Sequence, residues 1–236
     1  MPEPLILVPG VLCDARSLTD ILTPLSRARA VTVAPSWIGD RIEEIASELL
    51  TAAPSRFALA GHDLGGAVAL EVLRRAPERV TRVALIGTNP LPDTPQEAGD
   101  REPQIIAART GRFEELLERQ LLPRLFPPGP ERNAQAIRVA EMALDLGAEV
   151  FARQWRALQR RRDQQSTLRR ITQPTLVVAG SEDAVVPLKR QAFAAELIPY
   201  AVFEEIAGAG HVPMIDAPER LAYVLEQWMR QPLVLR

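Results

Sequence analysis

Short apolar runs alternate with longer amphipathic segments along most of the chain. The runs are almost continuously hydrophobic, which predicts strands buried on both faces of a sheet. The helix-length segments between them predict a mostly parallel sheet with helices on both faces, an α/β fold. The six predicted strands are Pro4–Val8, Ala30–Val33, Phe57–Ala60, Val80–Ile86, Thr175–Ala179 and Ala201–Ile206. The predicted helices are Ala15–Leu25, Ile42–Ala53, Leu64–Arg75, Lys189–Leu197 and Pro218–Met229.

Residues 89–170 break this alternation, because they contain no strand-like run. The segment opens on the proline-rich NPLPDTP, which predicts an exit from the sheet. Helical patterns follow near Gln96–Arg109, Phe113–Leu122, Pro130–Leu146 and Ala148–Leu158. A helical insertion at the loop edge of a parallel sheet favours a lid over a binding site. We therefore expect a core formed by residues 1–88 and 171–236, with a helical lid at 89–170.

Composition narrows the function classes. The 236 residues are 47% hydrophobic, enough for a sizeable core, and the net charge of −2 argues against nucleic-acid or anionic-membrane partners. A single cysteine excludes an intrachain disulfide, and only two histidines accompany it, so we expect no metal and no cofactor. The start of the chain, MPEPLILVPG, does not resemble a signal peptide. We expect a cytoplasmic monomer or homodimer acting on a small molecule.

The stretch FALAGHDLGG, residues 57–66, predicts a buried strand, a sharp glycine-flanked turn and then a helix. In that context the turn is typical of a G-x-S-x-G nucleophile elbow, with Asp63 at the position of the serine. Such a turn presents its central side chain at the carboxyl edge of the sheet, often at a strained positive φ. The N–H of Leu64 opens the helix and suits developing negative charge in the same space.

Two later loops carry the other groups that a covalent hydrolase needs. Asp183 lies in VVAGSEDAVVP, residues 177–187, and His211 lies in IAGAGHVPMIDAPE, residues 206–219. Both loops follow strands and leave the same edge of the sheet as the elbow. The chain order of nucleophile, acid and histidine is the order known for such triads. The spacing G-x-x-D and the following VVP favour Asp183 over the adjacent Glu182.

These motifs together resemble the α/β-hydrolase superfamily over nearly the whole chain. LVPGVLCD resembles the oxyanion loop, AGHDLGG the elbow, GSEDAVVP the acid loop and GAGHVPMIDAPE the histidine loop. The resemblance implies an α/β-hydrolase fold without the family's N-terminal hairpin. It also implies that Val11 supplies a second oxyanion N–H beside that of Leu64. Many relatives have His-Gly where this chain has Pro9-Gly10, but the donor is the residue after the glycine.

Aspartate at the elbow resembles epoxide hydrolases and haloalkane or haloacetate dehalogenases. There a carboxylate attacks an sp³ carbon, and histidine-activated water hydrolyses the resulting alkyl ester. On this interpretation Asp63, His211 and Asp183 act on a small, largely apolar substrate. His211 would lie between two carboxylates and rest as imidazolium until alkylation of Asp63 removes one charge. Epoxide hydrolases resemble one another in having lid tyrosines that protonate the leaving oxygen. The two tyrosines of this chain, Tyr200 and Tyr223, both lie outside the predicted lid.

Two alternatives stay open. LVPGVLCDARSL and GGAVALEVLRRAPERVTRVALIGTNPLPDTP resemble small bacterial serine esterases, whose elbow reads G-H-S-x-G-G. On that interpretation Asp63 replaces a serine, by nature or by engineering. Esterase activity is then weak or lost, because carboxylate attack on an ester gives a mixed anhydride. The third interpretation is a non-catalytic member of the fold that only binds a ligand.

Simpler structural roles are expected for several neighbours of the site. Taken alone, Asp63 could be a helix cap, and Asp14 is expected to cap the helix that follows it. His62 is expected to be packed and hydrogen-bonded, and Cys13 to be a buried small side chain. Trp155 is expected to pack the lid onto the core. The basic run QRRRDQQ, residues 159–165, is expected to be an exposed helix face.

Overall fold

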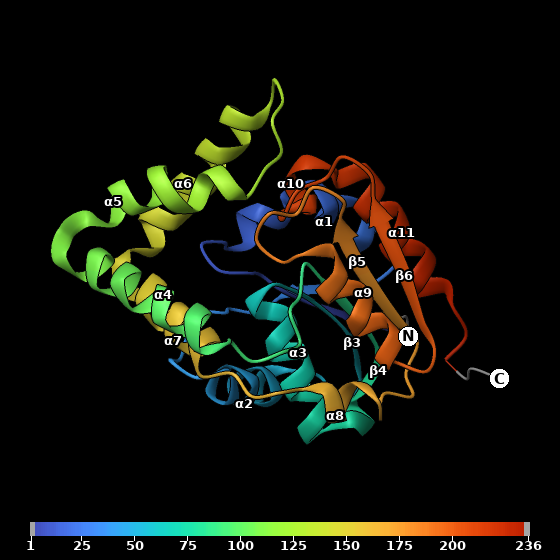
Figure 1. Cartoon of the computed structure of the whole chain (residues 1–236). Helices are drawn as coiled ribbons and strands as arrows, with labels where there is room; N and C mark the ends of the chain where they lie inside the picture. Colours follow the sequence, from blue (N-terminus) through green and yellow to red (C-terminus); the bar gives the residue numbers. More distant parts are fainter. Residues whose placement is uncertain (1–2, 234–236) are drawn as a thin grey trace.

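The computed structural model describes residues 3–233 and contains one six-stranded parallel sheet (Figure 1). The strands lie in the order β2-β1-β3-β4-β5-β6. Their bounds are β1 Leu5–Val8, β2 Val31–Val33, β3 Phe57–His62, β4 Val80–Ile86, β5 Thr175–Gly180 and β6 Ala201–Ile206. The order reverses direction at β1, so the chain first builds toward β2 and then crosses to β3. The parallel sheet predicted from the alternation of strands and helices is confirmed.

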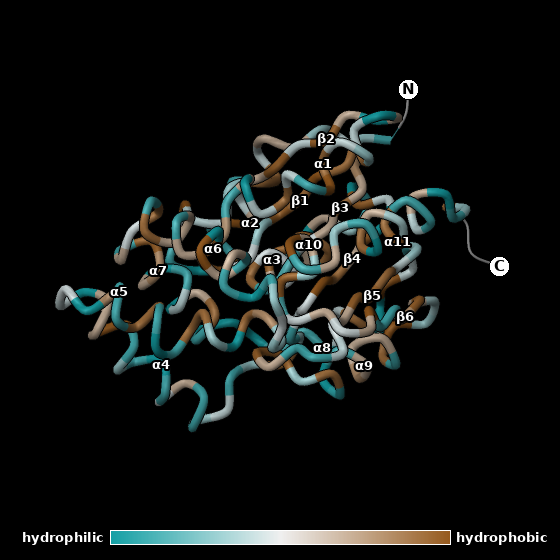
Figure 2. Tube along the Cα trace, turned by 90° about the horizontal axis from the view of Figure 1, so that it is seen from above, coloured by the Kyte–Doolittle hydropathy of each residue, from teal (hydrophilic) through white to brown (hydrophobic). Residues whose placement is uncertain are grey.

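Burial separates the four central strands from the two at the edges. Every residue of β1, β3 and β5 is buried, and β4 has one partly buried residue. The edge strands β2 and β6 are mostly half-buried or exposed, so the expectation of burial on both faces is wrong for them. Each edge strand has a neighbour on one side only, and helices cover it less completely. Figure 2 shows the hydrophobic strands running through the middle of the molecule.

Helices cover both faces of the sheet, as predicted. On one face, α1 (Thr19–Ser26) packs against α11 (Pro218–Arg230). On the other, α2 (Ile42–Ala52) packs against α3 (Leu64–Arg75), and α8 (Gln165–Leu168) links α3 to α9 (Leu188–Leu197). Figure 1 shows these two layers on either side of the strands. The predicted helix at Ala15–Leu25 is a 3-10 turn, η1 (Ala15–Leu18), that continues into α1.

The segment between β4 and β5 is helical, and we call residues 89–170 the helical insertion. It contains α4 (Pro95–Ala107), α5 (Phe113–Leu116), α6 (Arg132–Leu146) and α7 (Ala148–Gln159), besides α8. Two π-helical segments, η3 (Ala108–Arg112) and η4 (Leu117–Leu121), and one 3-10 turn, η5 (Leu122–Arg124), join these helices. Gly111 lies at φ 83° and interrupts the helix between α4 and α5. In Figure 1 the insertion projects to one side of the sheet.

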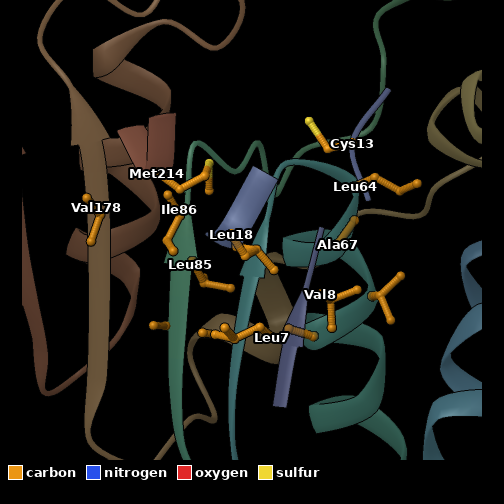
Figure 3. Close-up of a cluster of buried hydrophobic side chains, with 14 of the residues drawn as sticks. Leu7, Val8, Cys13, Leu18, Leu64, Ala67, Leu85, Ile86, Val178 and Met214 are labelled. Atoms are coloured by element: carbon orange, nitrogen blue, oxygen red, sulfur yellow. The ribbon is translucent and has the colours of Figure 1, made fainter. Parts of the chain in front are cut away.

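The core extends directly beneath the elbow. Figure 3 shows Leu7, Val8 and Leu85 from the strands, Ala67 from α3 and Met214 from α10 (Pro213–Asp216) in one buried cluster. These side chains fix the ends of β1 and β3 against the start of α3. The site therefore stands on the most buried part of the sheet, where backbone positions are held by packing on every side.

Candidate active site

Asp63 lies at a strained turn between β3 and α3. Its backbone has φ 49° and ψ −110°, one of two non-glycine positive φ values among the described residues. The side chain makes no helix-capping hydrogen bond. The reading of Asp63 as a simple helix cap is therefore wrong, and the elbow predicted from GHDLGG is the geometry observed. Strain of this kind is held in place by its surroundings and is common at functional sites.

Two glycines of the elbow are required by close backbone approach. A Cβ on Gly61 would overlap the backbone of Gly65, and a Cβ on Gly65 would overlap the carbonyl of Val8. Any larger residue at either position would push the helix away from the strands. The glycines therefore bring the N-terminus of α3 against the loop that follows β1. This contact sets the distance between Asp63 and the oxyanion loop.

His211 connects the two acidic residues. Its Nδ1 is 3.0 Å from Oδ2 of Asp183, and its Nε2 is 4.0 Å from Oδ2 of Asp63. Asp183 is held in turn by the N–H groups of Val185 and Val186, at 2.8 and 2.9 Å. The structure thus brings together the three residues predicted from separate loops, with the histidine between the carboxylates. Exposed fractions are 4% for the His211 side chain and 14% for that of Asp63, so one face of Asp63 is open.

The charges around His211 decide its protonation. Burial would lower its pKa, but Asp183 first and then Asp63 outweigh burial and raise the pKa to about 10. Burial would raise the pKa of Asp63, yet the hydrogen bond and charge of His211 hold that pKa well below its usual range. The pKa of Asp183 is lowered against burial by the same histidine. The resting site at neutral pH is therefore an imidazolium between two carboxylates.

The loop after β1 points a backbone donor at Asp63. The N–H of Val11 donates to Oδ2 of Asp63 at 3.2 Å. The N–H of Leu64 opens α3, where helix geometry leaves donors without an intrahelical acceptor. Leu12 has φ 63°, and its N–H donates to Oε1 of Gln154 at 3.3 Å. The residues expected to form an oxyanion hole thus lie together around the Asp63 side chain.

Sequence reasoning missed Gln154. This residue belongs to α7 in the helical insertion, its side chain is fully buried, and its amide also donates to Oγ of Ser36 at 3.3 Å. A single glutamine in an amphipathic helix carries no signal that it faces a loop 142 residues away. Through Gln154 the insertion holds the loop that carries Val11.

Two adjoining pockets open at Asp63. The inner pocket, of about 40 Å³, is lined mainly by apolar side chains and by His211. The outer pocket is a cleft of about 260 Å³ and is much more polar. Both are lined by Asp63, Arg124, Trp155 and Val185. The expected apolar character therefore describes the inner pocket only, because the outer cleft is lined by several charged groups.

We call the outer pocket the arginine cleft, because Arg101, Arg124 and Arg161 line it. The exposed helix face expected for QRRRDQQ is wrong at Arg161, whose side chain is 6% exposed. Its Nη1 lies 2.8 Å from Oδ1 of Asp93, and its Nε donates to the carbonyl of Leu91. The run ends helix α7 and turns inward to meet the segment after β4. Charge density alone could not reveal that turn.

Asp14, Cys13 and His62 have the structural roles expected of them, whereas the interactions of Trp155 with Phe151, Gln104 and Arg101 lie within the helical insertion and do not show the expected packing onto the core. Asp14 caps η1 by accepting from the N–H of Arg16, and Cys13 is buried, with burial and nearby carboxylates raising its pKa to about 12. His62 is buried and its Nε2 lies 2.8 Å from the carbonyl of His211. Trp155 packs on Phe151, with ring centroids 5.0 Å apart, and also lines both pockets.

The described residues contain no group of three or more side chains placed to hold a metal ion. Within residues 3–233 there is also no helix long and apolar enough to cross a membrane. The site itself combines the carboxylate of Asp63, the buried His211 and the backbone N–H of Val11. These groups suit covalent catalysis with an oxyanion or alkyl-ester intermediate.

Comparison with known proteins agrees with this geometry. Residues 5–222 match the sequence profile of the alpha/beta hydrolase family. The chain is 30% identical over 212 residues to a pimeloyl-[acyl-carrier protein] methyl ester esterase of Aromatoleum aromaticum, covering 81% of each chain. It is 28% identical over 208 residues to the biotin biosynthesis bifunctional protein BioHC of Teredinibacter turnerae, covering 81% of this chain but only 36% of that protein.

A solved structure gives the same result. A thermophilic esterase from Thermogutta terrifontis superposes with a TM-score of 0.86 at 25% identity, covering 98% of this chain and 90% of that one. The likeness extends over the core and the helical insertion alike. Two of these three relatives are named as esterases, and none of the three is named as an epoxide hydrolase or dehalogenase.

Proposed function

Since this chain belongs to the alpha/beta hydrolase family, we propose that it is an esterase-type hydrolase of a small carboxylic ester with Asp63 at the nucleophile position. The observation that carries the proposal is the arrangement of His211 between Asp183 and Asp63, at 3.0 and 4.0 Å, with the N–H of Val11 directed at Asp63. The esterase relatives favour an ester over an epoxide or a carbon–halogen bond.

In this proposal each group has a defined role. The ester carbonyl enters the inner pocket, and the N–H groups of Val11 and Leu64 stabilise its developing oxyanion. Asp183 orients His211 through Nδ1, which leaves Nε2 facing the reacting atoms. The helical insertion acts as the lid, with Trp155 and Arg124 closing the pocket beside the substrate.

Asp63 makes ester turnover slow, for three separate reasons. Its Oδ2 accepts from the N–H of Val11, which is the donor that the ester oxyanion needs. Its charge helps to keep His211 protonated, with a pKa raised to about 10, so the histidine is a poor base at pH 7. Attack of its carboxylate on an ester carbonyl gives a mixed anhydride, which is less stable than an acyl-serine.

A second candidate is hydrolysis of an epoxide or a carbon–halogen bond through an alkyl-enzyme ester. The low pKa of Asp63 favours it, because the nucleophile is then fully ionised. One carboxylate oxygen would attack the sp³ carbon, and the halide would leave, or the epoxide oxygen would take a proton. Water activated by His211 would then attack the ester carbonyl of Asp63 and release the alcohol.

The test compares this chain with Asp63→Ser on a short-chain aryl ester at pH 8. We expect the serine variant to hydrolyse the ester at least about 100-fold faster, since one substitution restores the nucleophile, frees the oxyanion donor and lowers the histidine pKa. His211→Gln in the serine background should remove the gain. A serine variant as slow as the original chain would overturn the esterase assignment.

The second candidate has its own readout. A single turnover of an epoxide or haloalkane in ¹⁸O-labelled water should label the Asp63 carboxylate if an alkyl ester forms and is hydrolysed at its carbonyl. Turnover without label in Asp63 excludes that route. Ligand binding with neither ester nor alkyl turnover, in the chain and in the serine variant alike, would favour the non-catalytic binder instead.

A further inference from the structure

The helical insertion contacts the histidine loop as well as the oxyanion loop. The N–H of His211 donates to the carbonyl of Leu125 at 2.8 Å, and Leu125 directly follows the 3-10 turn η5. On the other side, Nε2 of His62 donates to the carbonyl of His211 at 2.8 Å. The backbone of His211 is therefore held between the insertion and the strand that leads to the elbow. We call residues 122–128, with the sequence LPRLFPP, the η5 segment.

The η5 segment lies very close to the histidine loop at Gly210. A Cβ on Gly210 would lie 2.5 Å from the carbonyl oxygen of Leu125 and 2.9 Å from Cδ of Pro127. The third nearest atom, Cα of Phe126 at 3.1 Å, belongs to the same segment. Gly210 is not among the glycines with positive φ, so its own backbone conformation would accept alanine. The η5 segment fills the space that a side chain at this position would need.

The same segment also reaches the acid loop. Nη2 of Arg124 donates to the carbonyl of Ala184 at 2.8 Å. Ala184 follows Asp183, whose Oδ2 lies 3.0 Å from Nδ1 of His211. Two consecutive residues of the insertion, Arg124 and Leu125, therefore bond to the two loops that carry the histidine and its acidic partner.

The composition of the η5 segment makes it stiff. Three of its seven residues are prolines, whose rings fix φ and also restrict the residue before each proline. Leu125 and Phe126 are buried, and the carbonyl of Pro123 accepts from Nη2 of Arg132 on α6 at 2.6 Å. A stiff and buried support holds the group bonded to it more precisely than a free loop does.

We propose that the η5 segment is a positioning element of the site, which orients the ring of His211 toward Asp183 and toward the side chain at position 63. The insertion then helps to form the catalytic pair, besides covering the pocket. The catalytic consequence rests on the proposed ester hydrolase function. A displacement of about 1 Å in a reacting group costs roughly 100-fold in rate, so the contact matters even if the pocket keeps its shape.

The kinetic test uses Gly210→Ala in the Asp63→Ser protein, with the short-chain aryl ester at pH 8. The added methyl group must displace the η5 segment, so we expect kcat to fall by about 10-fold or more. Gly99→Ala is the matched control, since Gly99 lies in α4 of the insertion with open space at its Cβ position. The control should keep kcat within about 2-fold of the parent. An unchanged kcat in Gly210→Ala, with or without a rise in KM, would overturn the inference.

Ring proton NMR tests the same geometry without any ester, in the chain that keeps Asp63. Burial lowers the pKa of His211, but Asp183 and Asp63 outweigh burial and raise the pKa to about 10. This pKa falls if the ring turns away from the carboxylates. We expect a lower pKa of His211 in Gly210→Ala and an unchanged one in Gly99→Ala. Faster hydrogen exchange of the His211 amide should accompany it, because that N–H loses the carbonyl of Leu125.

Arg124→Met is a second variant, which does not crowd the histidine loop. It removes the bond to the carbonyl of Ala184 from an exposed residue, so the fold should be kept. Its readout is exchange of the His211 amide, because the loss of a cation would itself change the ring pKa. We expect faster exchange than in Arg119→Met, a control on an exposed arginine of the same insertion. If Gly210→Ala does not fold, equal exchange in these two arginine variants would overturn the inference.

The two proposals fail separately. If no variant hydrolyses an ester, but Gly210→Ala lowers the His211 pKa and speeds exchange of its amide, the esterase function fails and the positioning role stands. If Asp63→Ser hydrolyses the ester, and Gly210→Ala changes neither kcat nor the His211 pKa, the esterase function stands and the positioning role is excluded.

Discussion

Oδ2 of Asp63 accepts a hydrogen bond from the N–H of Val11 at 3.2 Å, and the same oxygen lies 4.0 Å from Nε2 of His211. In a serine hydrolase these two groups serve the substrate, one as oxyanion donor and the other as base. Here the side chain of Asp63 interacts with both groups. The carboxylate thus occupies the place where negative charge would develop in the proposed ester reaction, and a substrate must compete with it.

The histidine pKa values give a direct measurement of this arrangement. The chain has two histidines, so ring proton NMR resolves each one. We expect His211 to titrate near pH 10 because Asp183 and Asp63 outweigh its burial, and His62 near pH 4 because burial and the charge of His211 lower its pKa. In Asp63→Asn the His211 pKa should fall. A His211 resonance that titrates near 6.5 in the unaltered chain would contradict the ion triad.

The same pKa makes stability depend on pH. His211 has a folded pKa of about 10 against an ordinary 6.5, so its stabilisation is complete below about pH 6.5 and is lost as pH rises through 10. We expect the free energy of unfolding in urea to fall from pH 7 to pH 10. His211→Gln is the control, since the difference between the two proteins isolates this histidine. Parallel pH curves for both would show that the pKa is not raised.

Backbone strain at Asp63 predicts an order of stability among variants without the carboxylate. Asp63→Ala keeps a Cβ at φ 49°, whereas Asp63→Gly removes it. Both lose the ion pair with His211 equally. We expect the free energy of unfolding of Asp63→Gly to exceed that of Asp63→Ala by about 1–3 kcal/mol, which is the cost of strained backbone at one residue. Equal urea midpoints would mean that the turn relaxes once the side chain is gone.

Local sequence patterns predicted the elements and the three residues that meet at the candidate site, because both depend on short-range rules. Asp63 could be placed from the strand, turn and helix around it, and His211 from the strand before its loop. Gln154 and Arg161 could not, since their roles depend on where the helical insertion meets the core. A buried glutamine reads as a surface residue of an amphipathic helix until its partner, the N–H of Leu12, is known.

Gln154 predicts an effect on catalysis from outside the pocket. Gln154→Met keeps the volume but removes the acceptor for the N–H of Leu12, so the loop that carries Val11 loses its support. In the Asp63→Ser protein we expect kcat to fall about 10-fold with little change in KM, since the oxyanion donor acts in the transition state. Ser36→Ala removes only the hydroxyl partner of the Gln154 amide, leaves the Ser36 carbonyl as its acceptor, and should leave kcat within about 2-fold of the parent.

The result for this pair is decisive in either direction. If Gln154→Met lowers kcat and Ser36→Ala does not, the bond to Leu12 positions the oxyanion loop. If both variants keep the kcat of the parent, the loop is held by its own packing and Gln154 is only structural. A rise in KM alone would place the effect in substrate binding instead.

Removing the negative charge of Asp93 is expected to cause a large loss of stability. Its side chain is 2% exposed and pairs with both Arg101 and Arg161, so Asp93→Asn keeps the shape but removes the anion from the buried Arg161 and the partly buried Arg101. We expect the free energy of unfolding in urea to fall by about 3–5 kcal/mol, as for other buried ion pairs broken on one side. The matched control is Asp145→Asn, whose pair with Arg16 is exposed and should matter by less than about 1 kcal/mol. A loss no larger than that of the control would show that water solvates the two guanidinium groups as well as the carboxylate does.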